Sequence, residues 1–238
     1  VGGSTVGLLA GIRALAPFGS EVIAARNCHK AVYHAIELGR LTAHYLPPPV
    51  DTAFGVYGSV PPAAVEAALT AHPQAKCVIL TSPTYEGVLS DIASIAAICH
   101  AHNVPLLVVA AGADLVVQSA HKTLPSLTQT AFLQLNGGLA DPDEVERQLD
   151  VFETSSPSYP LLVSLDGCTD WLAADGPAAF ARWGSNLPAR GRVNAYPQQG
   201  TRCLRGNACT HPAGTSNSPL QSGSSFSRSS NGSGPATA

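Results

Sequence analysis

The sequence contains no methionine, no CxxC pair and no run of eighteen apolar residues. Without such an apolar run, a membrane-spanning helix is not predicted. The six cysteines occur singly, which does not fit the paired spacing of a zinc or redox motif. Cys77 and Cys99 lie in apolar segments, as buried thiols do, and this favours a reducing intracellular compartment, cytoplasmic or organellar. The absence of methionine and the abrupt start predict that the chain is a fragment.

Charge is scarce and unevenly distributed. Only 12% of the residues are charged, and after Asp175 the sequence has six arginines but no Asp, Glu or Lys. Because acidic residues outnumber basic ones before that point, no nucleic-acid partner is predicted. Residues 176–238 are rich in Ser, Gly, Pro, Asn and Arg without apolar periodicity, which predicts a low-complexity, disordered tail. Residues 1–175 are predicted to form one folded domain.

Within residues 1–175, short apolar runs alternate with helical patterns. This alternation predicts an α/β fold with a doubly wound, mostly parallel sheet, in which ligands bind at the carboxyl ends of the strands. The predicted strands cover 21–26, 42–46, 76–81, 105–111, 114–117 and 130–135, and the predicted helices cover 4–16, 31–38, 60–71, 91–102 and 141–149.

Lys122 lies just after the predicted strand 114–117 and is flanked by His121 and hydroxyl residues. A lysine amine can form a Schiff base with the aldehyde of pyridoxal 5'-phosphate (PLP), whose phosphate and ring nitrogen also need partners. The alternative is an ordinary solvated lysine. Lys30 offers the same chemistry, but it opens a helix and is expected to face solvent.

Other polar residues also fall where strands end or helices begin. Ser4 and Thr5 open the first helix, where either suits the N-cap and where free N–H groups bind anions. A P-loop is not predicted, because no Gly-Lys-Ser/Thr follows. His29 follows the strand 21–26, although a lone histidine at such a junction is also compatible with a structural role. Because 82–84 follow another strand, these motifs converge on one edge and predict a cofactor site.

No metal site is predicted. His100 and His102 are two residues apart, so they do not share one helix face. Cys203, Cys209 and His211 are only three candidate ligands and lack the paired spacing of a zinc site.

Several stretches resemble the Orn/Lys/Arg decarboxylase family, group III of the PLP decarboxylases. Ser-Ala-His-Lys-Thr-Leu-Pro at 119–125 resembles the PLP attachment motif, and Arg-Asn-Cys-His-Lys at 26–30 matches a second motif closely. The segments 81–87 and 155–162 resemble two further family stretches. The family belongs to PLP fold-type I, the aspartate aminotransferase superfamily. At the start of the first helix the family has a Gly-Ser-Thr or Gly-Thr-Ser turn that holds the cofactor phosphate, and Gly-Ser-Thr at 3–5 resembles it. The departure there is Gly2, where the family usually has Asn.

The resemblance implies a PLP-dependent decarboxylase of ornithine, lysine or arginine that yields a polyamine precursor, as a homodimer or higher oligomer. It implies that Lys122 carries PLP and that His29 lies against its ring. The hydroxyl and imidazole groups expected at the phosphate are those of Ser4, Thr5, Ser119 and His121; His121 is alternatively expected at the substrate α-carbon. Two alternatives stay open: a catalytically inactive PLP-fold fragment or pseudoenzyme, and a fold-type I aminotransferase.

The predicted strands 105–111 and 114–117 are separated by only two residues. Parallel neighbours need a crossover of about a dozen residues, so this link predicts a hairpin that would carry Lys122 to the opposite edge. The family has an Asp-Glu-Ala-His segment and a further loop at this point, and its Asp pairs with the ring nitrogen of PLP. Here Val109 stands where that Asp is expected. A deletion around 109–113 is therefore predicted.

Overall fold

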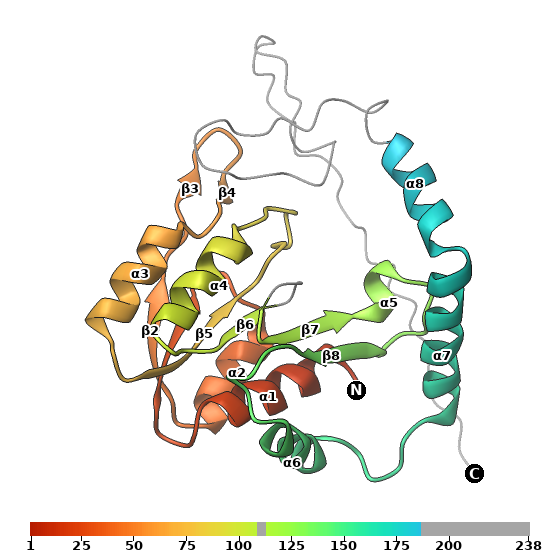
Figure 1. The fold of residues 1–238 in the computed structure, drawn as a ribbon, viewed down its shortest axis with the longest axis horizontal. Coiled ribbons are helices and arrows are strands. Elements are labelled where there is room, and N and C mark those ends of the chain that lie inside the picture. Colours follow the sequence, from red (N-terminus) through yellow and green to blue (C-terminus); the bar gives the residue numbers. More distant parts are fainter. Residues whose placement is uncertain (109–112, 187–238) are drawn as a thin grey trace, which may run out of the picture.

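The computed structural model describes residues 1–108 and 113–186. Their main feature is a six-stranded sheet in the order β2-β1-β5-β6-β7-β8, beside a small two-stranded sheet, β3-β4 (Figure 1). Only β8 runs antiparallel to its neighbour in the main sheet. The strands are β1 (Glu21–Ala25), β2 (Thr42–Leu46), β3 (Val50–Asp51), β4 (Val56–Tyr57), β5 (Ala75–Leu80), β6 (Leu106–Val108), β7 (Leu115–Ser119) and β8 (Ala131–Leu135).

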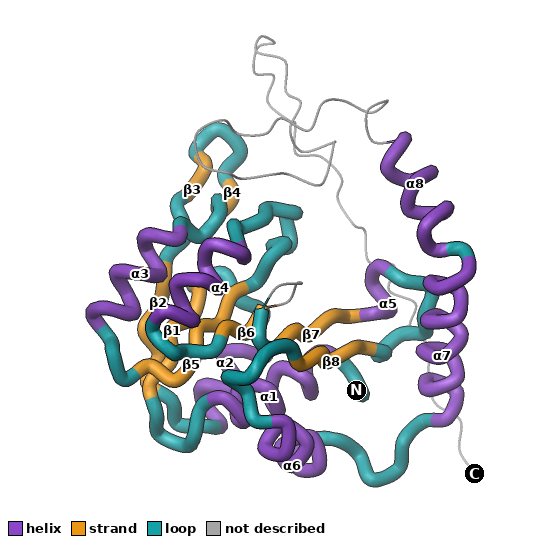
Figure 2. Tube along the Cα trace, in the orientation of Figure 1, coloured by secondary structure: helices purple, strands orange, loops and turns teal. Residues whose placement is uncertain are grey.

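Helices cover both faces of the main sheet, as the colouring by secondary structure shows (Figure 2). One core cluster joins α1, α2 and α6 to the sheet, and a second joins α3 and α4 to the other face. This confirms the predicted α/β fold with a mostly parallel sheet. The helices are α1 (Ser4–Leu15), α2 (Lys30–Leu38), α3 (Pro62–Ala71), α4 (Ile92–Ala101), α5 (Ala120–Thr123), α6 (Pro142–Phe152), α7 (Tyr159–Ala174) and α8 (Gly176–Asn186).

Strand β1 shows why the sheet is buried on both faces. Val22 and Ala24 belong to the first core cluster, whereas Ile23 and Ala25 belong to the second. Because alternate side chains of a strand point to opposite faces, an unbroken apolar run supplies both layers.

Helix α1 lies directly against β7 because two glycines face the strand. A Cβ atom on Gly7 would lie 3.1 Å from Val117 Cγ1, and one on Gly11 would lie 2.4 Å from Leu115 Cδ2. The four-residue spacing puts both glycines on one side of the helix. This close approach brings the start of α1 beside the end of β7.

The expected hairpin between the strands flanking the short link is wrong. Strands β6 and β7 pair in parallel, with Leu107 opposite Leu115 and Val108 opposite Val116. The register gives the reason. Strand β6 ends at Val108 and β7 begins at Leu115, which lies opposite Leu107. The connection therefore has to reach back by only about one residue position along β6, and it does not need the length of a crossover that spans a whole strand. Lys122 consequently follows the same edge of the sheet as the ends of β1 and β5. The predicted deletion itself falls on 109–113, of which 109–112 lie outside the described residues.

Helix caps agree with the sequence in some places and not in others. Asp91 and Asp141 cap α4 and α6, accepting hydrogen bonds from the backbone N–H groups of Ser94 and Asp143. The predicted cap of α1 is wrong, because Ser4 and Thr5 both lie inside the helix and Gly3 is the N-cap, with a φ of 123°. Glycine tolerates this positive φ, which a residue with a Cβ rarely adopts.

Two consecutive helices end the described part of the chain. Helix α8, Gly176–Asn186, consists of the first eleven residues of the predicted tail. The remainder of that tail, 187–238, lies outside the described residues. The boundary predicted at 175 therefore stays a prediction. Among the described residues, no helix combines the length and apolar character needed to cross a membrane.

Candidate active site at the carboxyl edge of the sheet

Three parallel strands deliver the predicted site residues to one edge. The stretch that contains Asn27 and His29 follows β1, Ser82 follows β5, and α5 with Lys122 follows β7 directly. Because the carboxyl ends of parallel strands meet at one edge, residues far apart in sequence become neighbours there.

The start of α1 meets the end of β7 in a direct side-chain contact. The hydroxyls of Ser4 and Ser119 are hydrogen-bonded to each other. Gly3 contributes no side chain to cap α1. The N–H groups of the first turn of this twelve-residue helix therefore point to the same place as two hydroxyls, and such a helix start attracts anions. Thr5, the next residue of the helix, is exposed.

Lys122 is presented on a short, well-anchored turn. It lies in α5, and its side chain is exposed, whereas Ala120 two residues earlier is fully buried. The backbone N–H of Ala120 donates to the Thr130 carbonyl at 3.1 Å, and His121 Nδ1 donates to the same carbonyl at 2.9 Å. This bond fixes the proton of a neutral His121 on Nδ1, so its Nε2 is the nitrogen left to accept a proton.

His29 is the N-cap of α2, and its ring is electrostatically coupled to Lys122. Its Nδ1 accepts a hydrogen bond from Ala31 N at 3.2 Å. The pKa of His29 is lowered, first by partial burial of the ring and then by the charges of Lys122 and Lys30. The imidazole is therefore kept neutral at neutral pH. A neutral flat ring close to the amine of Lys122 can stack against an aromatic ligand.

Asn27 is a candidate that the sequence alone did not identify. Its Oδ1 is buried and accepts no hydrogen bond from any described residue. Buried polar atoms nearly always have a partner, so an open acceptor beside His29 points to a ligand donor. The signal was its place inside the 26–30 motif, to which no role was given. The adjacent Cys28 is unsuited to nucleophilic chemistry, because burial raises the pKa of its thiol to about 11.

The Asp that the resemblance places at the ring nitrogen is not found among the described residues, and the Glu153 carboxylate at this edge is already bonded to the start of the chain, where its Oε1 accepts from Gly2 N at 2.8 Å. Val109, at the expected position, lies outside the described residues. Asp114 is the nearest acidic residue in sequence, but it lies at the amino edge of the sheet. There its Oδ2 accepts from Leu106 N at 2.8 Å and lies 2.9 Å from His100 Nε2.

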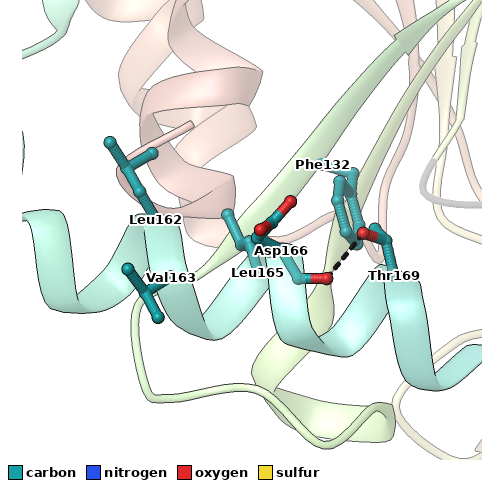
Figure 3. Close-up of a pocket in the computed structure, with 6 residues that line it drawn as sticks. All are labelled: Phe132, Leu162, Val163, Leu165, Asp166 and Thr169. Atoms are coloured by element: carbon teal, nitrogen blue, oxygen red, sulfur yellow. Dashed lines mark hydrogen bonds between the residues drawn. The ribbon is translucent and has the colours of Figure 1, made fainter.

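A groove of about 480 Å³ lies elsewhere, between β8 and α7 (Figure 3). In it, the Thr169 hydroxyl donates to the Asp166 carbonyl. None of the predicted site residues lines this groove, so it does not replace the carboxyl edge as the candidate site. Its lining consists of Phe132, Leu162, Val163, Leu165, Asp166 and Thr169.

The predicted histidine pair on α4 does not form a joint site. His100 pairs with Asp114, whereas His102 Nε2 lies 3.0 Å from Glu66 Oε1. Each imidazole has a different carboxylate partner, as expected for residues on different faces of a helix. The other rejected set, at 203, 209 and 211, lies outside the described residues.

The chain is similar in sequence to curated proteins over about two thirds of its length. The chain is 40% identical over 185 residues to the uncharacterized protein YaaO of Bacillus subtilis, covering 70% of this chain and 38% of that protein. It is 34% identical over 176 residues to the arginine decarboxylase of Halalkalibacterium halodurans, covering 66% of this chain and 36% of the relative. The chain thus spans well under half the length of these curated relatives.

The solved structure of the constitutive lysine decarboxylase of E. coli superposes with a TM-score of 0.68 at 22% identity, covering 79% of this chain and 31% of that one. At this identity the likeness establishes the fold, which is the PLP fold-type I architecture that the sequence predicts. The family model described as "Orn/Lys/Arg decarboxylase, major domain" matches residues 1–114 and 110–176. The chain therefore belongs to the Orn/Lys/Arg decarboxylase family and carries part of its major domain.

Proposed function

We propose that this chain carries the PLP-binding part of an enzyme that decarboxylates ornithine, lysine or arginine to a polyamine precursor. The observation that carries the proposal is the convergence of an amine, a neutral imidazole and an anion-binding helix start at one edge of the sheet. When bound, PLP supplies the electron sink for loss of the carboxylate. The remaining work falls to side chains of the chain itself.

The described residues fit the phosphate and aldehyde ends of PLP. The N–H groups of the first turn of α1 and the hydroxyls of Ser4, Thr5 and Ser119 would hold the phosphate, a role supported by the contact between Ser4 and Ser119. Lys122 offers its amine to the aldehyde. The hydrogen bond between Ser4 and Ser119 links α1 to the turn before Lys122, so it would keep the phosphate site and the amine of Lys122 in a fixed relation.

The middle of the cofactor is assigned to His29 and Asn27. The lowered pKa of His29 keeps its ring neutral, which suits stacking on the pyridine ring and avoids a second cation beside Lys122. The open acceptor of Asn27 is available to a donor of the ligand. His121 either completes the phosphate site or exchanges a proton with the substrate α-carbon through Nε2, and the two roles remain alternatives.

We further propose that a family segment is missing around 109–113 of the domain formed by 1–175. The family match supports this, since it consists of two ranges that overlap at 110–114. Two overlapping ranges are what a chain gives when an internal stretch of the family is absent from it. The Val at 109, where the resemblance expects the ring-nitrogen Asp, has the same explanation.

The Val at 109 in place of the expected Asp also supports the alternative of an inactive PLP-fold fragment or pseudoenzyme. The aminotransferase alternative has weaker support, because the motifs at 26–30 and 119–125 resemble the decarboxylases. Association into a homodimer or higher oligomer is part of the proposal. It is supported by large apolar side chains that α7 and α8 expose, among them Val163 and Trp183.

The test is to reconstitute the full chain with PLP, record the absorbance of the bound cofactor, and measure CO2 release from lysine, ornithine and arginine. A PLP-specific band that disappears in Lys122→Ala and persists in Lys30→Ala is expected. CO2 release establishes the decarboxylase, and a band without turnover establishes the inactive binder. Amino transfer to a 2-oxo acid would identify the aminotransferase. Absence of any band would overturn the proposal.

A further inference from the structure

A cluster of three potential metal ligands lies near the amino edge of the sheet, away from the candidate active site. Glu21 begins β1, His44 lies in β2, and His72 is the C-cap of α3. Glu21 Oε2 is 3.0 Å from His44 Nε2. The His44 and His72 rings are stacked with their centroids 3.5 Å apart. One ligand atom from each of the three residues lies within 4.8 Å of the other two.

The backbone holds these side chains together. In the parallel pairing of β1 and β2, His44 is opposite Ile23, so Glu21 lies diagonally from His44 on the same face of the sheet. Ile23 belongs to the core cluster beneath α3 and α4, and α3 brings His72 over that face. Backbone bonds from His72 N to Ala68 O and from Ala75 N to His72 O fix the end of the helix.

We propose that Glu21, His44 and His72 bind one divalent transition-metal ion of the zinc class. Two imidazole nitrogens and one carboxylate oxygen are ligands that Zn²⁺ accepts, with water in the fourth tetrahedral position. Magnesium and calcium prefer sites made of oxygen ligands, so they are not expected here. Glu21 and His44 are 38% and 24% exposed, which leaves the site open to an ion from solution.

Binding requires a small rearrangement of the two stacked rings. A metal lies roughly in the plane of an imidazole that ligates it, at about 2.0–2.1 Å from the nitrogen. The His44 and His72 planes are inclined by only 13°, so one ion cannot lie in both planes while the rings remain stacked. His72 is partly exposed at the end of α3, and rotation of its side chain frees the stack. The ion then replaces the proton between Glu21 and His44.

The expected consequence is stabilisation rather than catalysis. The ion would join the start of β1, the middle of β2 and the end of α3, and ligands that bind only the folded state raise its stability. Because the imidazoles must be deprotonated to bind, affinity is expected to fall when the pH is lowered from 7.5 to 5.5.

The test uses the full chain without an affinity tag and with Cys203→Ser and Cys209→Ser, so that these tail thiols do not compete for metal. Calorimetric titration with Zn²⁺ is expected to show one ion per chain, and Zn²⁺ but not Mg²⁺ is expected to raise the melting temperature by several degrees. His44→Ala and His72→Ala should each weaken Zn²⁺ binding at least tenfold, and Glu21→Gln should weaken it less.

His102→Ala is the matched control, because His102 also pairs with a carboxylate at 3.0 Å but belongs to no group of three potential ligands among the described residues. Its Zn²⁺ affinity should equal that of the parent chain. Circular dichroism of each variant without metal checks that the fold is retained. If a histidine variant does not fold, the proposal is tested on the parent chain instead. Zn²⁺ should raise the melting temperature of the parent chain, and this rise should be smaller at pH 5.5 than at pH 7.5. Unchanged affinity in His44→Ala and His72→Ala, or no Zn²⁺ effect on the parent chain, would overturn the proposal.

Discussion

The two edges of the main sheet use polar residues in opposite ways. At the carboxyl edge, Lys122 is exposed and Asn27 Oδ1 has no partner among the described residues. At the amino edge, Asp114 is buried and satisfied by His100 and the Leu106 N–H. Unmet hydrogen-bonding capacity marks a ligand site, whereas internally paired charges mark a structural role. The comparison assigns cofactor binding to the carboxyl edge and a stabilising role to the amino edge.

Helix direction contributes to this difference. At the carboxyl edge helices begin, and α1 offers its N-terminal N–H groups there. At the amino edge helices end, and His72 and His100 lie at the last turns of α3 and α4. Helix N-termini favour anions and C-termini favour cations. The carboxyl edge is therefore suited to a phosphate, and the amino edge to imidazoles and metal ions.

The largest expected effect comes from adding the ring-nitrogen Asp that the resemblance expects at 109, where the sequence has Val. A carboxylate can move the pKa of a neighbouring cation by roughly 1–3 units, and one unit corresponds to about 1.4 kcal/mol. Without it a ring nitrogen loses its proton more readily, which lowers the decarboxylation rate about a hundredfold or more. The chain as printed is therefore expected to show little or no CO2 release.

The matching experiment inserts a family-like segment of about twenty residues, beginning Asp-Glu-Ala-His, after Val108. Turnover should appear in the extended chain and be absent when the inserted Asp is Asn. Strong turnover by the chain as printed would show that the carboxylate is not needed here.

The amino edge is expected to respond in stability. Asp114→Ala removes the acceptor of the buried Leu106 N–H, which should lower the free energy of unfolding by about 1–3 kcal/mol. Glu66→Ala breaks an exposed pair with His102 and should cost less than about 1 kcal/mol. Urea denaturation measures both values. Equal losses in the two variants would contradict the structural role of Asp114.

The contact that connects the two edges is the packing of α1 on β7. Gly11→Val should destabilise the protein by about 1–3 kcal/mol, because Leu115 is buried and cannot move away from an added side chain. Gly167→Ala is the control in α7, since nothing lies within 4 Å of its added Cβ. That variant should be neutral or slightly stabilised. Thermal unfolding distinguishes the two, and a neutral Gly11→Val would refute the close packing.

The smallest expected effect is electrostatic. Because burial and Lys122 lower the pKa of His29, its NMR titration midpoint should lie below 6.5 and move upward in Lys122→Met. Lys76→Met should leave it unchanged, as Lys76 is not among its perturbing groups. In the window between 6.5 and the folded pKa, the unfolded state binds more protons, so acidification lowers this contribution to stability. An unchanged titration midpoint of His29 in Lys122→Met would contradict the placement of His29 beside Lys122 in the candidate site.

Local patterns predicted most of the fold. Apolar runs bounded by caps such as Asp91 predicted the six strands of the main sheet and five of the helices, and their alternation predicted the parallel sheet. The parallel pairing of β6 with β7 was missed because the prediction considered only the length of the connection. The register of the two strands, in which Leu107 lies opposite Leu115, cannot be read from that length. The N-cap at Gly3 was missed because residue preference at caps does not contain the backbone φ.

The candidate site was predictable where motifs are contiguous in sequence, as around Lys122 and His29. Asn27 was not identified, since an unsatisfied buried oxygen becomes visible only when the surrounding atoms are placed. The cluster of Glu21, His44 and His72 was also invisible, because its members are far apart in sequence and meet only through strand pairing and helix packing.

The central claim is that Lys122 at the carboxyl edge carries the cofactor. Reduction of the PLP-loaded full chain with borohydride, followed by peptide mapping, tests it most directly, because the label marks the attached lysine whether or not the chain turns over. The sequence has only two other lysines, Lys30 and Lys76, which serve as internal controls. We expect the label on the peptide that contains Lys122. A label on Lys30 or Lys76 instead would contradict the account.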